Sequence, residues 1–221
     1  ILSIDQFNRK DIDLIFKTAD SLFPFASRQK ITRVLQGAIL SNMFFEPSTR
    51  TRISFGSAFN MLGGEVRETT EIEATSLAKG ESLYDTSRVL SGYSDVIVMR
   101  HPQAGSVAEF AEASRVPVIN GGDGDNEHPS QALLDLFTIK KELESHNKEI
   151  DTARIALIGD LKFGRAAHSL CKILMLYTNI SIKLVSPDKL KLPDFLISEF
   201  KKKNISILET QDIKEGIADV D

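Results

Sequence analysis

One short stretch, FFEPSTRTRISF at residues 44–55, gathers hydroxyl and guanidinium side chains where an apolar segment gives way to a helical pattern. Ser48 or Thr49 can cap the helix that follows, and capping is the simplest structural explanation. Capping needs only one side chain, whereas Thr51 and Arg50 add further donors at the same helix N-terminus. Free backbone N–H groups, the helix dipole and a bidentate guanidinium together bind phosphate oxygens. The stretch therefore predicts a phosphate site.

The absence of the triphosphate-binding loop motif argues against a nucleotide triphosphate as the ligand of this site. The pattern G-x-x-x-x-G-K-[ST] does not occur in the sequence. A kinase or nucleotide-binding domain would need such a loop for a triphosphate. The second segment that suggests a nucleotide site, GDLKFGR at 159–165, has Gly159 and Gly164 but lacks the G-x-G-x-x-G pattern, so dinucleotide binding is weakly supported.

Two other segments carry residues suited to catalysis. MRHPQ at 99–103 puts Arg100 at the end of an apolar run, where an arginine can also be the ion-pair partner of a sheet rim. HPSQ at 128–131 puts His128 before a long helical pattern, where a capping or loop role is equally open. DGDNE resembles a calcium loop, but His128 occupies the sixth position, which should be glycine, so we expect no metal there. His168 and the single cysteine, Cys171, lie in an apolar helical segment and are expected to pack in a core.

These residues must be positioned by regularly alternating elements. Buried apolar runs predict strands at 38–45, 95–100, 116–120, 154–160, 180–186 and 204–209. Periodic apolar patterns predict a first helix capped by Asn8, and further helices at 50–62, 82–90, 107–113, 131–144, 165–176, 193–203 and 212–217. Gly63 and Gly64 are expected to end the second helix.

Strands that alternate with helices predict an α/β fold with parallel sheets covered on both faces. We expect two doubly wound parallel-sheet domains, residues 1–130 and 131–221, joined by the long helix at 131–144. Ligands bind beyond the carboxyl ends of such strands, where Arg50, Arg100, His128 and Arg165 fall. The last residues, IADVD, read as the approach to a further strand, and there is no initiator Met. We therefore expect a portion of a longer chain with an incomplete second domain.

Composition limits the function classes. The 221 residues include 27 basic and 31 acidic side chains, for a formal net charge of −4, which argues against a broad nucleic-acid surface. One cysteine excludes an internal disulfide and fits a reducing compartment. The sequence has no run long enough for a membrane span and no basic-then-apolar signal pattern. We expect a cytoplasmic protein without membrane contact.

The order and spacing of these motifs resemble those of the aspartate carbamoyltransferase (aspartate transcarbamoylase) family, in particular its catalytic chain. The resemblance runs through FFEPSTRTRISF, TSLAKGES, MRHPQ, NGGDGDNEHPSQALLDLFTI and GDLKFGR, and covers essentially the whole sequence. The S-T-R-T-R run is common to transcarbamoylases, whereas FFEP, MRHPQ and GDLKFGR indicate the aspartate branch. The resemblance implies transfer of the carbamoyl group of carbamoyl phosphate to the α-amine of L-aspartate, giving N-carbamoyl-L-aspartate and phosphate in pyrimidine biosynthesis. It implies no cofactor and no metal.

The resemblance also implies roles for individual residues. Those matching the carbamoyl phosphate site are Ser48, Thr49, Arg50, Thr51, Arg100, His128 and Gln131. Among them Thr51, Arg100 and His128 would donate to the carbonyl oxygen, and with Arg50 they form the implied catalytic set. Gln131 would fix the carbamoyl amide. Whether His128 or the phosphate accepts the proton of the amine stays open.

Other implied roles concern aspartate and a second subunit. Arg165 would hold the aspartate α-carboxylate, with Lys162 as charge support. Ser76 and Lys79 match residues that reach a neighbouring subunit's active site, where Lys79 would also contact aspartate, so a homotrimer with shared sites is implied. The SLAKGE loop is one residue shorter than the family form, and Ala166 replaces a frequent Thr, which puts one hydroxyl contact in doubt. A regulatory chain or a dihydroorotase is an open partner.

Two alternative functions share this phosphate site. An ornithine carbamoyltransferase would use the same carbamoyl phosphate and another amine. A catalytically silent homologue would serve as the scaffold of a multienzyme complex, but the presence of Arg50, His128 and Lys79 argues against it.

Overall fold

The computed structural model describes residues 1–70, 76–177 and 179–221, except for the side chains of Ser76 and Leu77. The chain divides into two compact units, residues 1–130 and 131–221, and each is described by itself. In the described part of the chain no helix has the length and apolar character needed to span a membrane.

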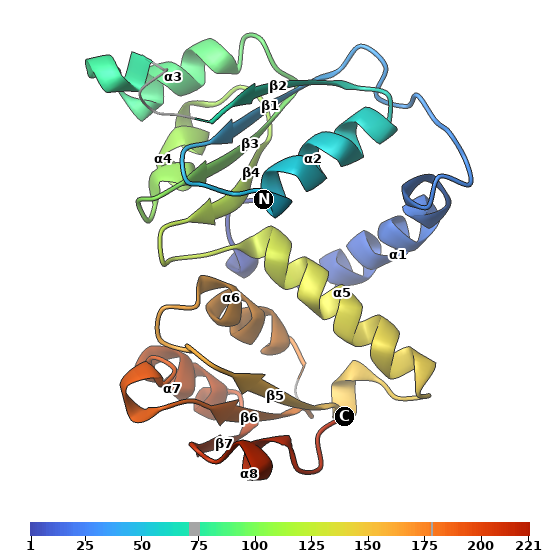
Figure 1. The fold of residues 1–221 in the computed structure, drawn as a ribbon, viewed down its shortest axis with the longest axis vertical. Coiled ribbons are helices and arrows are strands. Elements are labelled where there is room, and N and C mark those ends of the chain that lie inside the picture. The colour runs from blue at the N-terminus through green and yellow to red at the C-terminus, as the bar shows by residue number, and fades with distance from the viewer. Residues whose placement is uncertain (71–75, 178) are drawn as a thin grey trace. The chain divides into compact units, whose positions relative to one another are not determined.

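The first unit is built on a four-stranded parallel sheet in the order β2-β1-β3-β4. Its strands are β1 Ile39–Phe44, β2 Glu65–Thr69, β3 Val96–His101 and β4 Val118–Asp123. Its helices are α1 Arg9–Ala26, α2 Arg50–Met61, α3 Leu83–Leu90 and α4 Ser106–Ala113, with 3-10 turns η1 Ile4–Gln6 and η2 Ser76–Lys79. Helix α2 covers one face of the sheet, and α3 and α4 lie on the other (Figure 1). The predicted doubly wound arrangement is confirmed for this unit.

Strand alternation produces a core on each face of this sheet. Met43 and Phe45 of the β1 segment pack with Ile97, Phe110 and Val118 on the α4 side. Residues of the opposite parity, such as Leu40, Phe44 and Val98, pack against the α2 side chains Phe55 and Phe59. The strand period of two thus gives both faces an apolar surface, as a sheet covered by helices requires.

Helix α2 is fixed over the sheet by a buried polar contact. Asn42 is fully buried in β1, and its Nδ2 donates to Arg52 O at 3.0 Å and to Glu68 Oε1 at 3.1 Å. Arg52 also forms a 2.8 Å ion pair with Glu68. These contacts tie the first turn of α2 to β1 and β2. The helix ends where predicted, since Gly63 adopts φ +93°, and a Cβ there would lie 2.7 Å from Arg33 Cα.

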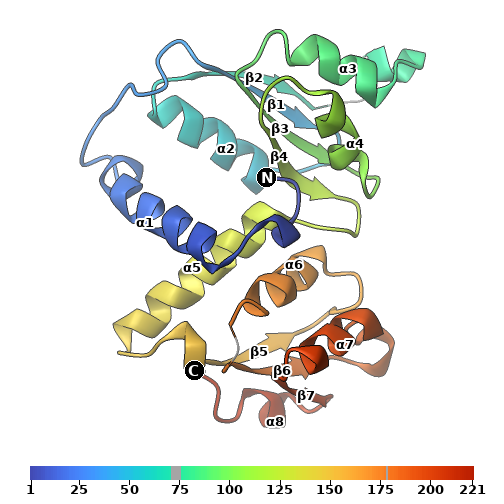
Figure 2. The ribbon, with the colours of Figure 1, turned by 180° about the vertical axis from the view of Figure 1, so that it is seen from behind.

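The second unit has a three-stranded parallel sheet in the order β5-β6-β7. Its strands are β5 Arg154–Ile158, β6 Ser181–Val185 and β7 Ser206–Thr210. Its helices are α6 Arg165–Leu174, α7 Asp194–Lys202 and α8 Ile213–Ile217, with 3-10 turns η3 Ile150–Thr152 and η4 Asp188–Leu190. Helices α6 and α7 lie on one face and α8 on the other (Figures 1 and 2). Helix α5, Pro129–Ser145, begins in the first unit and continues into the second.

The core roles predicted for Cys171 and His168 are confirmed. Both side chains are buried on α6, and His168 Nε2 lies 2.9 Å from Leu161 O. Burial raises the pKa of the Cys171 thiol to about 12. The thiol is therefore protonated at neutral pH and unreactive.

Candidate active site

The candidate site lies at one edge of the first sheet. Strands β1, β3 and β4 are consecutive neighbours, and all run parallel, so their carboxyl ends meet at the same edge. Hydrogen bonds continue the ladder past the strands, from Phe45 N to Arg100 O and from Gly124 N to His101 O, both at 2.9 Å. The segment after β1, Arg100 on β3 and the loop after β4 therefore converge, as predicted for a ligand edge.

The N-terminus of α2 has no side-chain cap. Thr49 occupies the N-cap position with φ −84° and ψ −55°, a helical rather than extended conformation, and makes no capping hydrogen bond. The prediction that Ser48 or Thr49 caps this helix is therefore right in position and wrong in chemistry, because an extended N-cap conformation is needed to aim the side chain back. The first-turn N–H groups are left for another acceptor.

The hydroxyl and guanidinium groups predicted to bind phosphate surround this helix start. Ser48 and Thr51 are half-buried, and Thr49 and Arg50 are exposed. Among the residues that the structure describes, Arg50 has no ion-pair partner. An uncapped helix N-terminus beside an uncommitted guanidinium is suited to a phosphate-sized anion.

Arg100 is the most constrained residue at this edge. Its side chain is 12% exposed, and Nη2 lies 2.5 Å from Glu46 Oε1, in the loop after β1. Its Nε is buried and has no hydrogen-bond partner. A buried donor without an acceptor costs about 1–3 kcal/mol. The rim ion pair considered from the sequence is therefore present, and a second donor of the same guanidinium remains unsatisfied.

His101, next to Arg100 in the sequence, makes local contacts within the turn after β3. Its Nδ1 accepts from Gln103 N at 3.1 Å, and its ring makes an edge contact with Phe45, with centroids 5.9 Å apart. Burial lowers the pKa of His101, against the opposing charges of Glu109 and Asp123. A neutral imidazole that accepts at Nδ1 shapes the turn after β3.

His128 and Gln131 lie at the start of α5. His128 is 6% exposed, and its Nδ1 lies 3.3 Å from Ser130 Oγ. The amide Nε2 of Gln131 donates to Asp135 Oδ1 at 2.8 Å, one turn further along the helix. Burial raises the pKa of Asp135, and the hydrogen bond from Gln131 opposes this shift. This contact leaves the carbonyl oxygen of Gln131 as the group able to accept from a ligand.

The predicted aspartate-binding residues of the second unit follow β5. The Asp160 carboxylate accepts from Lys162 N and Phe163 N, both at 3.0 Å, and this turn leads into α6, where Arg165 is the first residue. Lys162 is exposed, with Nζ 5.1 Å from the centroid of the Phe163 ring. Arg165 is half-buried.

The residues predicted to serve a neighbouring subunit lie on η2. Lys79 is exposed at the end of this turn. The side chain of Ser76 lies outside the described part of the structure. Within residues 1–70, 76–177 and 179–221, His, Cys, Asp and Glu side chains form no group of three or more that could hold a metal ion.

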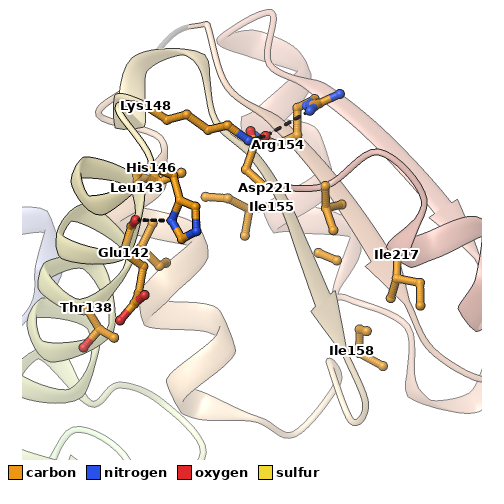
Figure 3. A pocket seen from close by; sticks show the side chains of 13 residues that line it. Thr138, Glu142, Leu143, His146, Lys148, Arg154, Ile155, Ile158, Ile217 and Asp221 are labelled. Carbon is orange, nitrogen blue, oxygen red and sulfur yellow. Dashed lines mark hydrogen bonds and ion pairs between the residues drawn. The ribbon is translucent and has the colours of Figure 1, made fainter.

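A cavity of about 560 Å³ occurs elsewhere, within the second unit (Figure 3). It is lined by the second half of α5, by β5 and by residues 217–221, and by none of the predicted site residues. At its rim Asp221 is paired with Arg154 at 2.9 Å and Lys148 at 2.8 Å. Hydrogen bonds from Arg154 and then Lys148 hold the pKa of Asp221 below its usual range. The cavity and the predicted site are thus separate features.

Among known protein families, residues 1–141 match the family model described as "Aspartate/ornithine carbamoyltransferase, carbamoyl-P binding domain". The aspartate carbamoyltransferase catalytic subunit of Cellvibrio japonicus is 64% identical over 221 residues, and that of Saccharophagus degradans is 62% identical. The alignments cover all of this chain and 65% and 66% of these relatives. The chain thus spans about two thirds of the length of the curated relatives that it matches.

Solved structures agree with this comparison. The catalytic subunit of M. jannaschii aspartate transcarbamoylase is 43% identical with a TM-score of 0.92, over 100% of this chain and 71% of that one. The Trypanosoma cruzi aspartate transcarbamoylase in complex with carbamoyl phosphate and aspartate is 41% identical with a TM-score of 0.87, over 96% of this chain and 70% of that one. The α/β fold with parallel sheets is shared with both.

Proposed function

The chain belongs to the aspartate/ornithine carbamoyltransferase family, and on this premise we propose that its protein transfers a carbamoyl group to L-aspartate. Carbamoyl phosphate donates the group, and the products are N-carbamoyl-L-aspartate and phosphate, a step of pyrimidine biosynthesis. The observation that carries the proposal is the buried Nε of Arg100, which lacks an acceptor at the sheet edge where α2 also begins without a cap.

Phosphate binding is assigned to the start of α2. The N–H groups of its first turn, the hydroxyls of Ser48, Thr49 and Thr51, and the guanidinium of Arg50 supply donors and positive charge. Charge-assisted hydrogen bonds of this kind are short, and arginine adds a bidentate fork. The leaving phosphate would keep these contacts as its charge grows.

Oxyanion stabilisation is assigned to Thr51, Arg100 and His128. The amine nitrogen attacks the carbonyl carbon, the bond from carbon to the phosphate oxygen breaks, and the amine proton leaves to the phosphate, or to His128 in the alternative in which His128 does not donate to the carbonyl oxygen. If Ser130 donates to His128 Nδ1, the imidazole proton is on Nε2 and can be donated to the carbonyl oxygen. One preorganised donor of this type lowers the barrier by ~3 kcal/mol. Gln131, with its amide nitrogen on Asp135, would accept from the carbamoyl NH₂.

Aspartate binding is assigned to Arg165 for the α-carboxylate, with Lys162 as supporting charge. Lys79 and Ser76 are proposed to act in the site of a neighbouring subunit, so the active form would be a homotrimer in the cytoplasm. Residues 1–130 would form the carbamoyl phosphate-binding domain and 131–221 part of the aspartate-binding domain. The relatives are named catalytic subunits, which leaves a regulatory chain or a dihydroorotase as a partner to be sought.

The test is an amine-swap assay on the full-length parent of this chain. We expect a ureido product with carbamoyl phosphate and L-aspartate, and none with L-ornithine. Product with ornithine alone would move the protein to the other branch of the family. Product with neither amine would favour the silent scaffold.

A further inference from the structure

Two buried carboxylates, Asp123 and Glu127, lie on either side of residues 124–126, directly before His128, and neither belongs to the predicted site. Asp123 ends β4 and is 2% exposed, and Glu127 immediately precedes His128 and is 4% exposed. Acidic side chains are seldom buried to this degree without dedicated partners. Their partners show which parts of the chain they hold.

The carboxylate of Asp123 accepts four N–H donors. Oδ1 accepts from Asn120 Nδ2 at 3.0 Å and from Glu127 N at 3.2 Å. Oδ2 accepts from Gly105 N at 2.9 Å and from Asn126 Nδ2 at 3.0 Å. With two donors on each oxygen, the buried carboxylate is stabilised by hydrogen bonds from neutral N–H groups.

One of these donors, Asn120, lies on β4, and the other three come from two different loops of the site. Gly105 ends the turn that follows Arg100 and His101, and it starts α4. Asn126 and Glu127 belong to the loop that leads to His128. The loops also touch directly, because a Cβ on Gly124, at φ +56°, would lie 2.8 Å from Ala104 N and 2.9 Å from Pro102 O. Asp123 therefore joins the loop after Arg100 to the loop before His128.

Glu127 extends the connection to the beginning of the chain. Its Oε1 accepts from Ser3 Oγ and its Oε2 from Ile4 N, both at 2.8 Å. Residues 1 and 2 run beside β4, since Asn120 N donates to Ile1 O at 2.8 Å and Asn120 Nδ2 to Leu2 O at 3.0 Å. The residue before His128 is thus held between the β4 edge and the N-terminal segment.

We propose that Asp123 and Glu127 are positioning residues that fix the His128 loop against the loop following Arg100. The inference rests on the proposed carbamoyl transfer, in which His128 and Arg100 must reach the same carbonyl oxygen. Neither carboxylate touches substrate in this role. A displacement of about 1 Å in a donor can cost ~10²-fold in rate, so the two loops need a rigid connection.

The first test replaces Asp123 by Asn in the full-length parent. Either orientation of the amide turns its NH₂ toward two N–H donors, so two of the four hydrogen bonds are lost and two donors are opposed. We expect kcat to fall by about tenfold or more, because the His128 contact matters in the transition state. The KM for carbamoyl phosphate is expected to change less than about threefold, because the α2 phosphate contacts are retained.

The matched control is Asp95→Asn. Asp95 directly precedes β3, at the amino ends of the strands and away from the candidate site, and its Oδ2 accepts from Ile39 N at 2.8 Å. The amide oxygen can still accept from Ile39 N, so this variant removes a loop carboxylate charge without touching the His128 loop and should keep its kcat. An Asp123→Asn enzyme with kcat within about twofold of wild type, or an equal fall in both variants, would overturn the inference.

Glu127 offers a second test that does not depend on the folding of the Asp123 variant. In Glu127→Gln the amide oxygen can accept from Ile4 N, and the NH₂ can donate to Ser3 Oγ, so kcat should stay near wild type. Glu127→Ala removes both contacts and should lower kcat by about tenfold. Equal activities of the Gln and Ala variants would contradict a positioning role.

Failure of the proposed function is distinguishable from failure of this inference. A wild-type parent that carbamoylates neither amine would contradict the function alone. The inference is then judged by the ¹⁵N imidazole signals of His128, without substrate. Asp123→Asn should shift these signals and Asp95→Asn should leave them in place, and unchanged signals in both variants would overturn the inference.

Discussion

Arg100→Lys separates the two roles that the structure gives to Arg100. A lysine keeps a positive charge that can pair with Glu46, as Nη2 of Arg100 does at 2.5 Å. It has no equivalent of Nε, the buried donor that lacks an acceptor in the ligand-free protein. Stability and catalysis should therefore respond differently to this substitution.

The expected magnitudes follow from those two contacts. The ion pair with Glu46 is mostly buried, and the lysine ammonium can retain it, so it should change the free energy of unfolding little. Removal of an unsatisfied buried N–H relieves a cost of about 1–3 kcal/mol, so the free energy of unfolding should not decrease. Loss of one oxyanion donor costs ~3 kcal/mol in the transition state, which is about 10²-fold in kcat.

The assay is steady-state formation of N-carbamoyl-L-aspartate by the full-length parent, combined with urea unfolding of the same variant. Arg52→Lys is the matched control, since Arg52 also pairs with a carboxylate, Glu68, at 2.8 Å. This control should keep kcat. An Arg100→Lys enzyme with kcat within about threefold of wild type would refute the assignment of Nε to the oxyanion. A fall in kcat accompanied by an equal loss of stability would also refute it.

Three further predictions concern single side chains. Arg50→Ala should raise the KM for carbamoyl phosphate by ~10- to 100-fold with unchanged unfolding, because a charge-assisted contact is lost; an unchanged KM would contradict the phosphate assignment. Cys171, with a thiol pKa raised to about 12, should react with an aromatic disulfide reagent at pH 8 only after denaturation. Rapid labelling of the native protein would contradict its burial. Asn8 accepts from Lys10 N at 2.9 Å and Asp11 N at 3.2 Å as the cap of α1. Asn8→Ala should therefore lower the free energy of unfolding by about 1 kcal/mol, measured in urea, and an unchanged value would contradict the cap.

Most elements could be predicted because their apolar patterns are local. Asn8 caps α1 as predicted, with Asp11 completing the capping box, and the buried runs became β1, β3 and β4. Strand β2 was missed. Its sequence, EVRET, is mainly exposed and has no apolar run, so its strand state depends on pairing with β1 rather than on its own pattern.

The sequence predicted a set of site residues, whose binding roles stay predictions, but it did not predict their contacts. The predicted helix start, the strand ends and the motif spacing together placed Arg50, Arg100 and His128 beyond the carboxyl ends of the strands. The hydrogen-bond partners of these residues could not be predicted from local sequence, because Glu46, which pairs with Arg100, lies 54 positions away in the sequence. Asp123 was noticed only as part of a failed calcium pattern. The weak signal for its role was a run of acidic and amide residues directly before His128, which spacing alone cannot distinguish from a solvated loop.

The most direct measurement is a crystal structure of the full-length parent with carbamoyl phosphate bound. We predict phosphate oxygens at the N-terminus of α2, against Ser48, Thr49 and Arg50. We also predict the carbonyl oxygen within ~3 Å of a donor atom of both Arg100 and His128. A carbamoyl phosphate bound away from this sheet edge, or one whose carbonyl oxygen meets neither side chain, would contradict the proposed mechanism.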